Sequence, residues 1–147
     1  MSREYTKVSV TEKAERALKG GHPWVFADEV TAVSGEYENG DIVDVYSKKA
    51  RYLGSGYIND NSKIRVRVIS KNPNDRFDEL FYERRVRYAI EYRLTVMSGD
   101  FDNCRLIFGE ADLFPGLTVD RFGNVLVMQV MSLGCERIKP TMVKALL

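Results

Sequence analysis

The chain has few of the residues on which metal sites and nucleophilic catalysis usually depend, with one histidine and two cysteines in 147 residues. Cys104 and Cys135 stand far apart with no second pair, so neither a zinc site nor a disulfide framework is expected. Both lie in or beside apolar strand segments, which favours buried packing over a nucleophilic role. A reducing, cytoplasmic setting fits this cysteine usage.

Phosphate-binding glycine motifs and long apolar runs are missing as well. The sequence contains no Gly-x-x-x-x-Gly-Lys loop and no Gly-x-Gly-x-x-Gly after a strand, so this chain is not expected to bind S-adenosylmethionine or another nucleotide cofactor itself. No stretch approaches the length of a membrane span, and residues 1–4 do not open a signal peptide. His22 stands alone in a Gly-His-Pro-Trp turn, so no catalytic residue and no metal ligand is predicted.

Charges of the two signs are nearly balanced, with 22 basic and 21 acidic residues and a net charge of +1. A nucleic-acid surface must therefore arise from how the charges are arranged rather than from their sum. The hydrophobic content of 44% is enough to form a core. The length suits one ordinary domain or two small ones.

The first part of the chain is typical of a small β-barrel with one short helix. Thr11 is a plausible N-cap for this helix, and Gly20-Gly21 is expected to end it. Residues 5–10 alternate as a half-buried strand would, and turn residues separate four further predicted strands at 24–33, 41–46, 52–58 and 64–69.

A polar segment around Pro73 interrupts this pattern and predicts a domain boundary. The expected domains are residues 1–70, the barrel, and residues 71–147, a mixed strand and helix domain. The predicted class of the whole chain is α+β.

The second domain is expected to combine two helices with hairpins. A long helix over 77–97 has two apolar faces, so it is expected to be packed on both, with Arg84 stacked on an aromatic ring. Pro140 is expected to open a last helix, which runs to the end of the chain without a cap, as though the chain were cut within it. Strands are predicted between the helices at 104–110, 117–120 and 125–131.

The strand near residue 65 carries the sharpest local signal for nucleic-acid binding. Alternation places Lys63, Arg65 and Arg67 on the face opposite the core, at a spacing that suits a phosphate backbone. A solvated strand face without a ligand is the alternative, and these residues alone slightly favour it. The preceding turn extends the candidate patch by three cations, Lys48, Lys49 and Arg51.

The turn after the first helix, Lys19-Gly20-Gly21-His22-Pro23-Trp24, is a second candidate site. Its glycines permit positive φ or the close approach of a ligand. Lys19 and His22 are suited to hold a phosphate, and Trp24 to stack on a base. The alternative is a helix stop in which Trp24 fills the barrel core. We favour this alternative for Trp24, and for Lys19 and His22 the two interpretations are even.

Several motifs occur together in the order found in one known family. They are Gly21-His22-Pro23-Trp24-Val25-Phe26, Leu53-Gly54-Ser55-Gly56-Tyr57, Ile64-Arg65-Val66-Arg67, Phe81-x-x-Arg84, the run from Arg105 through Leu113 to Asp120, and Gln129-x-x-Ser132-x-Gly134-x-Glu136. Nearly the whole chain thereby resembles a bacterial family of class I methyltransferases that act on large-subunit, 23S-type ribosomal RNA. That family makes 5-methylcytosine from S-adenosylmethionine.

The resemblance implies a PUA-like RNA-binding barrel, a small strand–helix–strand domain and a Rossmann-like catalytic domain that this chain lacks. The cofactor loop and the catalytic cysteine of such proteins lie in the third domain. PUA-like barrels generally contact RNA around the first helix and the loop after it, which favours RNA binding by Lys19, Gly20, Gly21 and His22, and raises the case for Lys63, Arg65 and Arg67.

In this interpretation the chain docks structured ribosomal RNA for its own C-terminal catalytic domain and transfers no methyl group by itself. The alternative is a domain-packing module with little RNA affinity, which predicts an exposed apolar patch around Phe114, Leu117 and the final helix.

Overall fold

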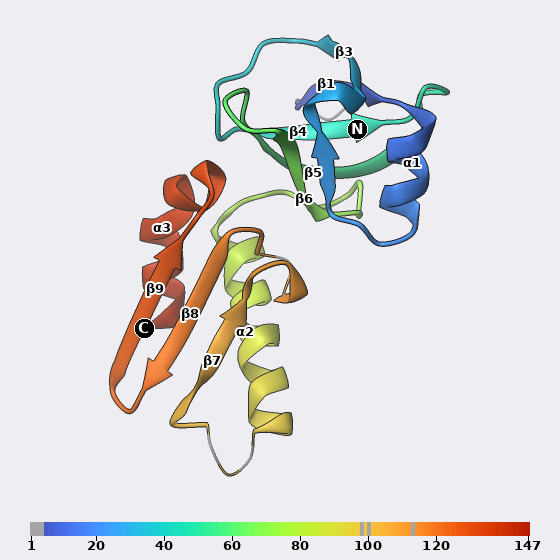
Figure 1. Ribbon diagram of the computed structural model, residues 1–147. Helices are drawn as coiled ribbons and strands as arrows, with labels where there is room; N and C mark the ends of the chain where they lie inside the picture. The colour runs from blue at the N-terminus through green and yellow to red at the C-terminus, as the bar shows by residue number, and fades with distance from the viewer. Residues whose placement is uncertain (1–4, 98, 100, 113) are drawn as a thin grey trace. The chain divides into compact units, whose positions relative to one another are not determined.

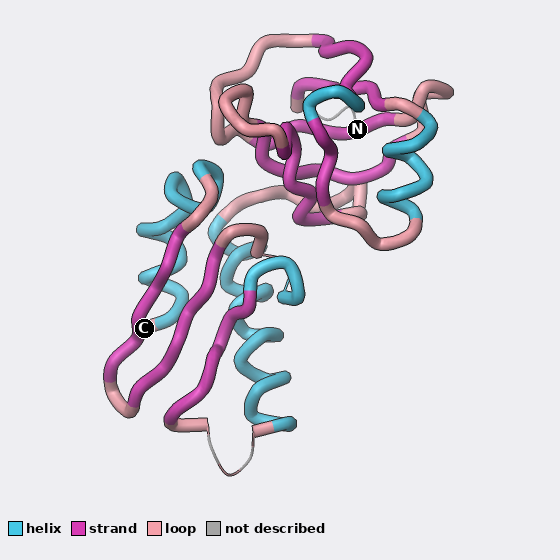
Figure 2. Tube along the Cα trace, in the orientation of Figure 1, coloured by secondary structure: helices cyan, strands magenta, loops and turns pink. Residues whose placement is uncertain are grey.

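A computed structural model describes residues 5–97, 99, 101–112 and 114–147. The chain forms two compact units, Met1–Asn74 and Asp75–Leu147, which are described one at a time (Figures 1 and 2). Residues 1–4, on which no signal peptide was expected, and Leu113 of the long motif lie outside the described residues.

The first unit is a curled six-stranded sheet in the order β2-β6-β5-β4-β1-β3, with one α-helix (Figure 1). β1 and β4 are parallel, and the other neighbouring strands are antiparallel. The predicted α+β class with a small barrel-like unit is confirmed. The elements of this first unit are β1 (Thr6–Val10), α1 (Glu12–Lys19), β2 (Trp24–Phe26), a 3₁₀ turn (Ala27–Glu29), β3 (Val30–Ser34), β4 (Ile42–Tyr46), β5 (Tyr52–Ile58) and β6 (Ile64–Ser70).

Strand alternation builds the core of this unit, because every second residue points to the inner face. α1 closes the inner face with Ala14 and Leu18, four residues apart and both buried. The strands contribute mainly valines to the same cluster: Val8, Val10, Val25, Val43, Val45, Val66 and Val68.

Residues 24–33 were expected to form one strand, and this expectation is wrong. A 3₁₀ turn at Ala27–Glu29 divides the segment into β2, which pairs with β6, and β3, which pairs with β1. The turn is held by Glu29, whose Oε1 accepts a hydrogen bond from the Phe26 backbone N–H at 3.0 Å. A local alternation pattern carries no information about this change of partner.

Two glycines allow β5 to approach β6 more closely than other residues would. A Cβ atom on Gly56 would lie 2.0 Å from the carbonyl oxygen of Arg67, and one on Gly54 would lie 2.8 Å from Val68 Cγ1. The Leu53–Tyr57 motif therefore fixes the position of the strand that carries Arg67.

The second unit is a three-stranded antiparallel sheet in the order β7-β8-β9, with two helices that pack against each other and against the sheet (Figure 1). None of the described helices in the chain is long and apolar enough to cross a membrane. The elements of this unit are α2 (Glu79–Val96), β7 (Asn103–Phe108), a 3₁₀ turn (Gly109–Asp112), β8 (Leu117–Phe122), β9 (Val125–Val130) and α3 (Leu133–Leu146).

The last helix begins earlier than expected. Ser132 caps α3, since its Oγ accepts a hydrogen bond from the Cys135 backbone N–H at 3.3 Å, and Pro140 lies inside the helix rather than at its first turn. The serine cap and the glutamate four residues later were the local signals for this start, and the proline was the misleading one.

The expectation that α2 is packed on two apolar faces is also wrong. One face is buried through Tyr82, Val86 and Ala89. On the aromatic face Phe81 is buried as well, but Tyr88 and Tyr92 are 65% and 57% exposed. Arg84 is exposed, and the neighbouring Arg85 is the one that stacks, with its guanidinium carbon 4.5 Å from the centroid of the Phe81 ring.

An exposed apolar patch was expected around Phe114, Leu117 and the final helix. Phe114 and Leu117 are buried, whereas Leu133 and Val143 of α3 are exposed. Exposed apolar side chains also lie on the sheet face turned away from the helices. Strand pairing places four of them on this face, which we call the open sheet face: Phe108, Phe122, Val125 and Val127.

Candidate nucleic-acid interface

The end of α1 presents Lys19 and His22 on a rigid turn. The His22 backbone N–H donates to the carbonyl oxygen of Ala17 at 3.0 Å, and that of Gly21 donates to Leu18 at 3.1 Å. This pair of hydrogen bonds is the Schellman motif, which needs a residue with positive φ just beyond the helix. Gly21 meets this need with φ 98°, so the predicted helix stop is confirmed.

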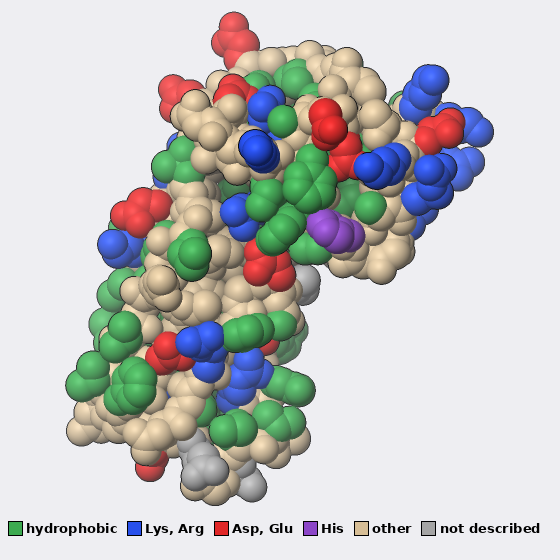
Figure 3. Space-filling model, in the orientation of Figure 1, with side chains coloured by type: hydrophobic (Ala, Val, Ile, Leu, Met, Phe, Trp, Pro, Cys, Tyr) green, Lys and Arg blue, Asp and Glu red, His purple; other side chains and the backbone are tan. Residues whose placement is uncertain are grey.

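Cations from two distant segments meet beside this turn. Lys19 Nζ donates to Glu15 Oε1 at 2.8 Å. This hydrogen bond, followed by the charges of Lys19, Arg51 and Lys49, lowers the pKa of Glu15. α1 contacts β5, the strand that directly follows the turn of Lys48, Lys49 and Arg51. Figure 3 shows Lys and Arg side chains gathered over α1 and this turn. We call Lys19, Lys48, Lys49 and Arg51 the α1 basic cluster.

The turn that carries the last three of these residues has a defined backbone. Ser47 Oγ accepts a hydrogen bond from the Arg51 backbone N–H at 3.1 Å, and the Ala50 N–H donates to the Ser47 carbonyl oxygen at 2.9 Å. Ala50 has φ 61°, a conformation that is uncommon for a residue with a Cβ atom. The side chains of Lys48, Lys49 and Arg51 are all exposed at this turn.

A fifth cation was missed from the sequence. Lys71 Nζ donates a hydrogen bond to the Leu18 carbonyl oxygen near the C-terminus of α1, where a positive charge is favoured by the helix dipole. The sequence gives no local signal for this contact, because Lys71 belongs to the polar segment that marks the end of the first unit.

An aromatic row runs along β2 and the residues before it. The ring centroids of His22 and Trp24 are 5.6 Å apart, and those of Trp24 and Phe26 are 6.3 Å apart. His22 and Phe26 are exposed and Trp24 is half-buried, while Val25 is buried on the opposite face. The interpretation of Trp24 as a core residue is therefore wrong, and the core position belongs to Val25.

His22 is oriented by its own turn. Its Nδ1 accepts a hydrogen bond from the Trp24 backbone N–H at 3.1 Å, which leaves Nε2 as the ring nitrogen that carries the proton in the neutral form. Figure 3 shows the purple histidine beside a group of hydrophobic side chains on the molecular surface. Phe26 was not selected from the sequence, although His22, Trp24 and Phe26 have the two-residue spacing of one strand face.

Arg67 adds a cation to the aromatic row. It pairs with Trp24 across β6 and β2, and its guanidinium carbon lies 5.5 Å from the centroid of the Trp24 ring. A guanidinium over an indole ring forms a cation–π contact and leaves a flat, positively charged surface. We call His22, Trp24, Phe26 and Arg67 the stacking row.

The structure gives Arg65 and Lys63 different surroundings. Arg65 is half-buried, and its Nη1 lies 3.7 Å from Asp60 Oδ1, which also accepts a hydrogen bond from the Tyr37 hydroxyl at 2.7 Å. Lys63 is exposed, and its carbonyl oxygen accepts the Ala27 N–H at 2.8 Å. Arg65 thus contacts Asp60, which in turn binds Tyr37 of another loop, while Lys63 extends into solvent.

The candidate cations do not form one continuous patch. In the register of β5 and β6, Ser55 pairs with Ser70, and Ile58 pairs with Val66. The Lys48–Arg51 turn precedes β5 and lies at the Ser70 end, whereas Lys63 precedes β6 and lies at the opposite end. Lys48, Lys49 and Arg51 therefore lie at the end of the sheet away from Lys63, and we group them with Lys19.

The chemistry of this surface is that of an anion-binding and stacking platform. The α1 basic cluster offers exposed ammonium and guanidinium groups, and the stacking row offers ring faces three residues further along the chain from Lys19. No group of three or more His, Cys, Asp or Glu side chains among the described residues is arranged to hold a metal ion.

Residues 8–71 match the family model of the PUA-like domain. The chain is 38% identical over 133 residues to the ribosomal RNA large subunit methyltransferase I of Cronobacter sakazakii, covering 90% of this chain and 34% of that protein. It is 34% identical over 143 residues to the protein of the same name from Klebsiella pneumoniae, covering 97% of this chain and 36% of that protein.

Solved structures show the same fold. A candidate S-adenosylmethionine-dependent methyltransferase from Streptococcus mutans superposes with a TM-score of 0.80 at 20% identity, over 95% of this chain and 36% of that chain. A methyltransferase candidate solved with SAH matches to the same extent. Residues 8–71 thus match the PUA-like domain, and nearly the whole chain is similar to the ribosomal RNA large subunit methyltransferase I proteins, of whose length it spans about a third.

Proposed function

We propose that this chain is the RNA-docking part of a ribosomal RNA methyltransferase. The carrying observation is the gathering of Lys and Arg side chains over α1 and the turn before β5 (Figure 3), in a chain whose net charge is only +1, with the stacking row beginning three residues after Lys19. Phosphates bind the exposed cations, and unpaired bases stack on His22, Trp24 or Phe26. The PUA-like family of this unit and the names of the relatives support ribosomal RNA as the partner.

The methyl transfer itself is assigned to the remaining length of such proteins. S-adenosylmethionine does not fit the described residues, because the described strands that precede an α-helix, β1, β6 and β9, each lead into it without a glycine-rich turn. The proposed product is 5-methylcytosine in large-subunit ribosomal RNA, made in the cytoplasm by a catalytic domain to which this chain is tethered. This part of the proposal derives from the sequence motifs that resemble the family.

Binding of a structured ribosomal RNA segment at increasing salt concentration tests the proposal. Affinity should fall as salt rises, since cations that contact phosphates release counterions. The double variant Lys49→Glu/Arg51→Glu should weaken binding and lower the salt slope by about one for each lost phosphate contact. Lys139→Glu/Lys144→Glu is the matched control, because both lysines are exposed on α3 in the second unit.

Affinity that does not respond to salt, or an equal loss in both double variants, would contradict an RNA site at the α1 basic cluster. Calorimetry with S-adenosylmethionine tests the assignment of the cofactor, and heat of binding to this chain alone would contradict it.

The open sheet face favours a second candidate function, a surface that packs against another protein domain. Phe122 and Val125 are 57% and 58% exposed and are direct partners across β8 and β9. A contiguous exposed apolar patch of this kind is typical of an interaction site. If Phe122→Ser raises the solubility of the chain without changing its RNA affinity, the patch serves packing rather than RNA.

A further inference from the structure

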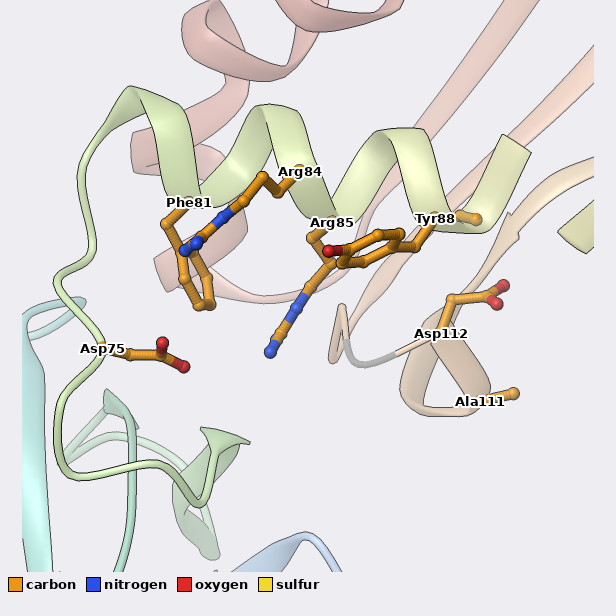
Figure 4. Close-up of a pocket in the computed structure, with 8 residues that line it drawn as sticks. Asp75, Phe81, Arg84, Arg85, Tyr88, Ala111 and Asp112 are labelled. Atoms are coloured by element: carbon orange, nitrogen blue, oxygen red, sulfur yellow. The ribbon is translucent and has the colours of Figure 1, made fainter. Parts of the chain in front are cut away.

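The second unit contains a pocket of about 460 Å³ beside α2. Its lining includes Phe81, Arg84, Arg85 and Tyr88 from the helix, Asp75 from the segment before it, and Asp112 from the 3₁₀ turn. In Figure 4 the arginines and Tyr88 project from the same side of α2, and Asp75 faces them. The volume lies in the range of pockets that hold small organic ligands.

Two arginines give this pocket an anion-binding wall. Arg85 is held in place by its contact with the Phe81 ring, at 4.5 Å, and Phe81 itself is buried and packed edge-on against Tyr82. Arg84 is exposed and has no hydrogen-bond or ion-pair partner within the part of the chain that the structure describes. One guanidinium is therefore fixed and the other is available, which suits a phosphate that two arginines share.

Tyr88 gives the pocket an unoccupied ring face. It lies three and four residues after the arginines, so all three side chains share one side of the helix. Tyr88 is 65% exposed, although Phe81, two turns earlier on the same side of the helix, is buried. An exposed tyrosine next to guanidinium groups is the usual platform for an unpaired base.

The acidic side chains of the pocket do not cancel its positive charge. Asp112 Oδ2 binds Arg93 Nη2 at 2.8 Å and accepts the Phe108 backbone N–H at 2.7 Å, so its charge is already compensated. Asp75 faces Arg84 and Arg85 across the pocket (Figure 4), and its single negative charge leaves one positive charge in excess. A carboxylate at this position also accepts a hydrogen bond from an amino group on a base edge.

We propose that this pocket binds one unpaired nucleotide of RNA, with its phosphate at Arg84 and Arg85 and its base stacked on Tyr88. The inference rests on the proposed RNA-docking function but concerns a different unit of the chain and a different form of RNA. The α1 basic cluster responds to the charge of any RNA, whereas this pocket requires a nucleotide that is free to leave a base-paired stack.

The test compares the full 147-residue chain with single variants on two RNA probes. One probe is a fluorescent oligocytidylate of about ten nucleotides, and the other is a fully paired RNA duplex of the same length. Tyr88→Ala should weaken binding of the oligocytidylate about tenfold and leave duplex binding unchanged, since a stacked base contributes roughly 1–3 kcal/mol. Tyr88→Phe keeps the ring and should bind like the unchanged chain.

Arg84→Ala should also weaken oligocytidylate binding, and Arg87→Ala is its matched control. Arg87 is also an exposed arginine on α2, but it is not among the residues that line the pocket. Equal losses for the two arginine variants would overturn the pocket as the site of the phosphate. Thermal unfolding of each variant checks that the exposed substitutions leave the fold intact.

Photo-crosslinking with 5-iodocytidine in the oligocytidylate locates the base. The expected crosslink is to Tyr88, mapped by mass spectrometry. A crosslink to Trp24 alone, with Tyr88→Ala binding unchanged and Lys49→Glu/Arg51→Glu weakened, would overturn this inference and leave the proposed RNA docking in place. Failure of the chain to bind either probe at low salt would overturn both.

Discussion

Arg67 and Trp24 are direct partners across β6 and β2, and the Arg67 guanidinium carbon lies 5.5 Å from the centroid of the Trp24 ring. This contact joins the strand with the strongest cationic pattern to the Gly-His-Pro-Trp turn, two features that are more than 40 residues apart in the sequence. It places a cation and an aromatic ring on the same surface. The Trp24 ring therefore lies on this surface and not in the core.

The single tryptophan makes this contact observable in solution. RNA binding should quench Trp24 emission, because a stacked base quenches indole fluorescence and no other tryptophan contributes. Arg67→Ala should change the emission of the free chain and cost about 0.5–1 kcal/mol of stability, the usual size of an exposed cation–π contact. Lys63→Ala, a cation of the same segment at the other end of the sheet, is the control. Constant emission at saturating RNA would place the RNA away from the stacking row.

Gly21 should be the sensitive glycine of the first turn, and Gly20 the tolerant one. Gly21 has φ 98°, so Gly21→Ala should cost about 1–2 kcal/mol by strain, although a Cβ atom there would meet nothing within 4 Å. Gly20 has φ −79°, and its added Cβ would make only ordinary contacts, so Gly20→Ala should change stability little. Urea unfolding of the two variants gives the comparison, and equal losses would contradict the Schellman assignment.

The local features of the fold were predictable because they depend on neighbouring residues only. Thr11 caps α1 by accepting the Ala14 N–H at 3.2 Å, and β5 spans Tyr52–Ile58, between the turn residues that flank it. The core valines of β6, Val66 and Val68, follow from the alternation of that strand. Caps and alternation act over four residues or fewer, so a single sequence contains the whole signal.

The features that were missed depend on partners far along the chain. The break at Ala27–Glu29 exists because β2 and β3 pair with different strands, and the separation of Lys63 from Lys49 follows from the register of β5 and β6. The exposure of Tyr88 depends on which face of α2 the sheet and α3 cover. Hydrophobic periodicity records only that a face is apolar and carries no information about what covers it.

Removal of the acidic residue next to the α1 basic cluster, Glu15, should strengthen RNA binding. Glu15 offsets part of the charge of Lys19, Lys49 and Arg51, so Glu15→Gln should raise affinity severalfold and steepen the salt dependence. Glu12→Gln is the control, since Glu12 is exposed on the first turn of the same helix. Filter binding at several salt concentrations measures both effects. No gain over the control would show that phosphates do not approach Glu15.

The same glutamate should titrate at an unusually low pH. Its pKa is lowered by the hydrogen bond from Lys19 and by the nearby positive charges. A carboxyl group whose pKa is lower in the folded state stabilises the fold above its unfolded pKa, and this contribution disappears as pH falls through the folded value. An NMR titration should find Glu15 ionised below pH 4.5, and Lys19→Ala should return its pKa toward the ordinary value.

Tyr37 should show the opposite dependence at alkaline pH. Its hydroxyl donates to Asp60 Oδ1 at 2.7 Å, and this hydrogen bond, with burial and the charge of Asp60, raises the pKa of the phenol above 10.0. The contribution to stability is therefore complete below pH 10 and is lost as pH rises through the folded value. Tyr37→Phe should remove this dependence, as followed by the ultraviolet absorbance of phenolate. A phenolate that forms below pH 10 at Tyr37 would contradict the hydrogen bond.

Asp112 should be the carboxylate on which the second unit most depends. It binds Arg93 at 2.8 Å and the Phe108 N–H at 2.7 Å, and the side chains of both ion-pair partners are about one-eighth exposed, at 13% and 12%. Asp112→Ala would leave the Arg93 charge and a backbone donor without their partner, which should cost roughly 2–3 kcal/mol. Asp120→Ala is the matched control. Asp120 binds Arg105 at 2.7 Å in a more exposed pair, so its loss should cost less than about 1 kcal/mol. Denaturant unfolding measures the loss of stability in each variant. Equal losses would show that the contacts of Asp112 stabilise the 3₁₀ turn and the pocket beside it no more than an exposed ion pair would.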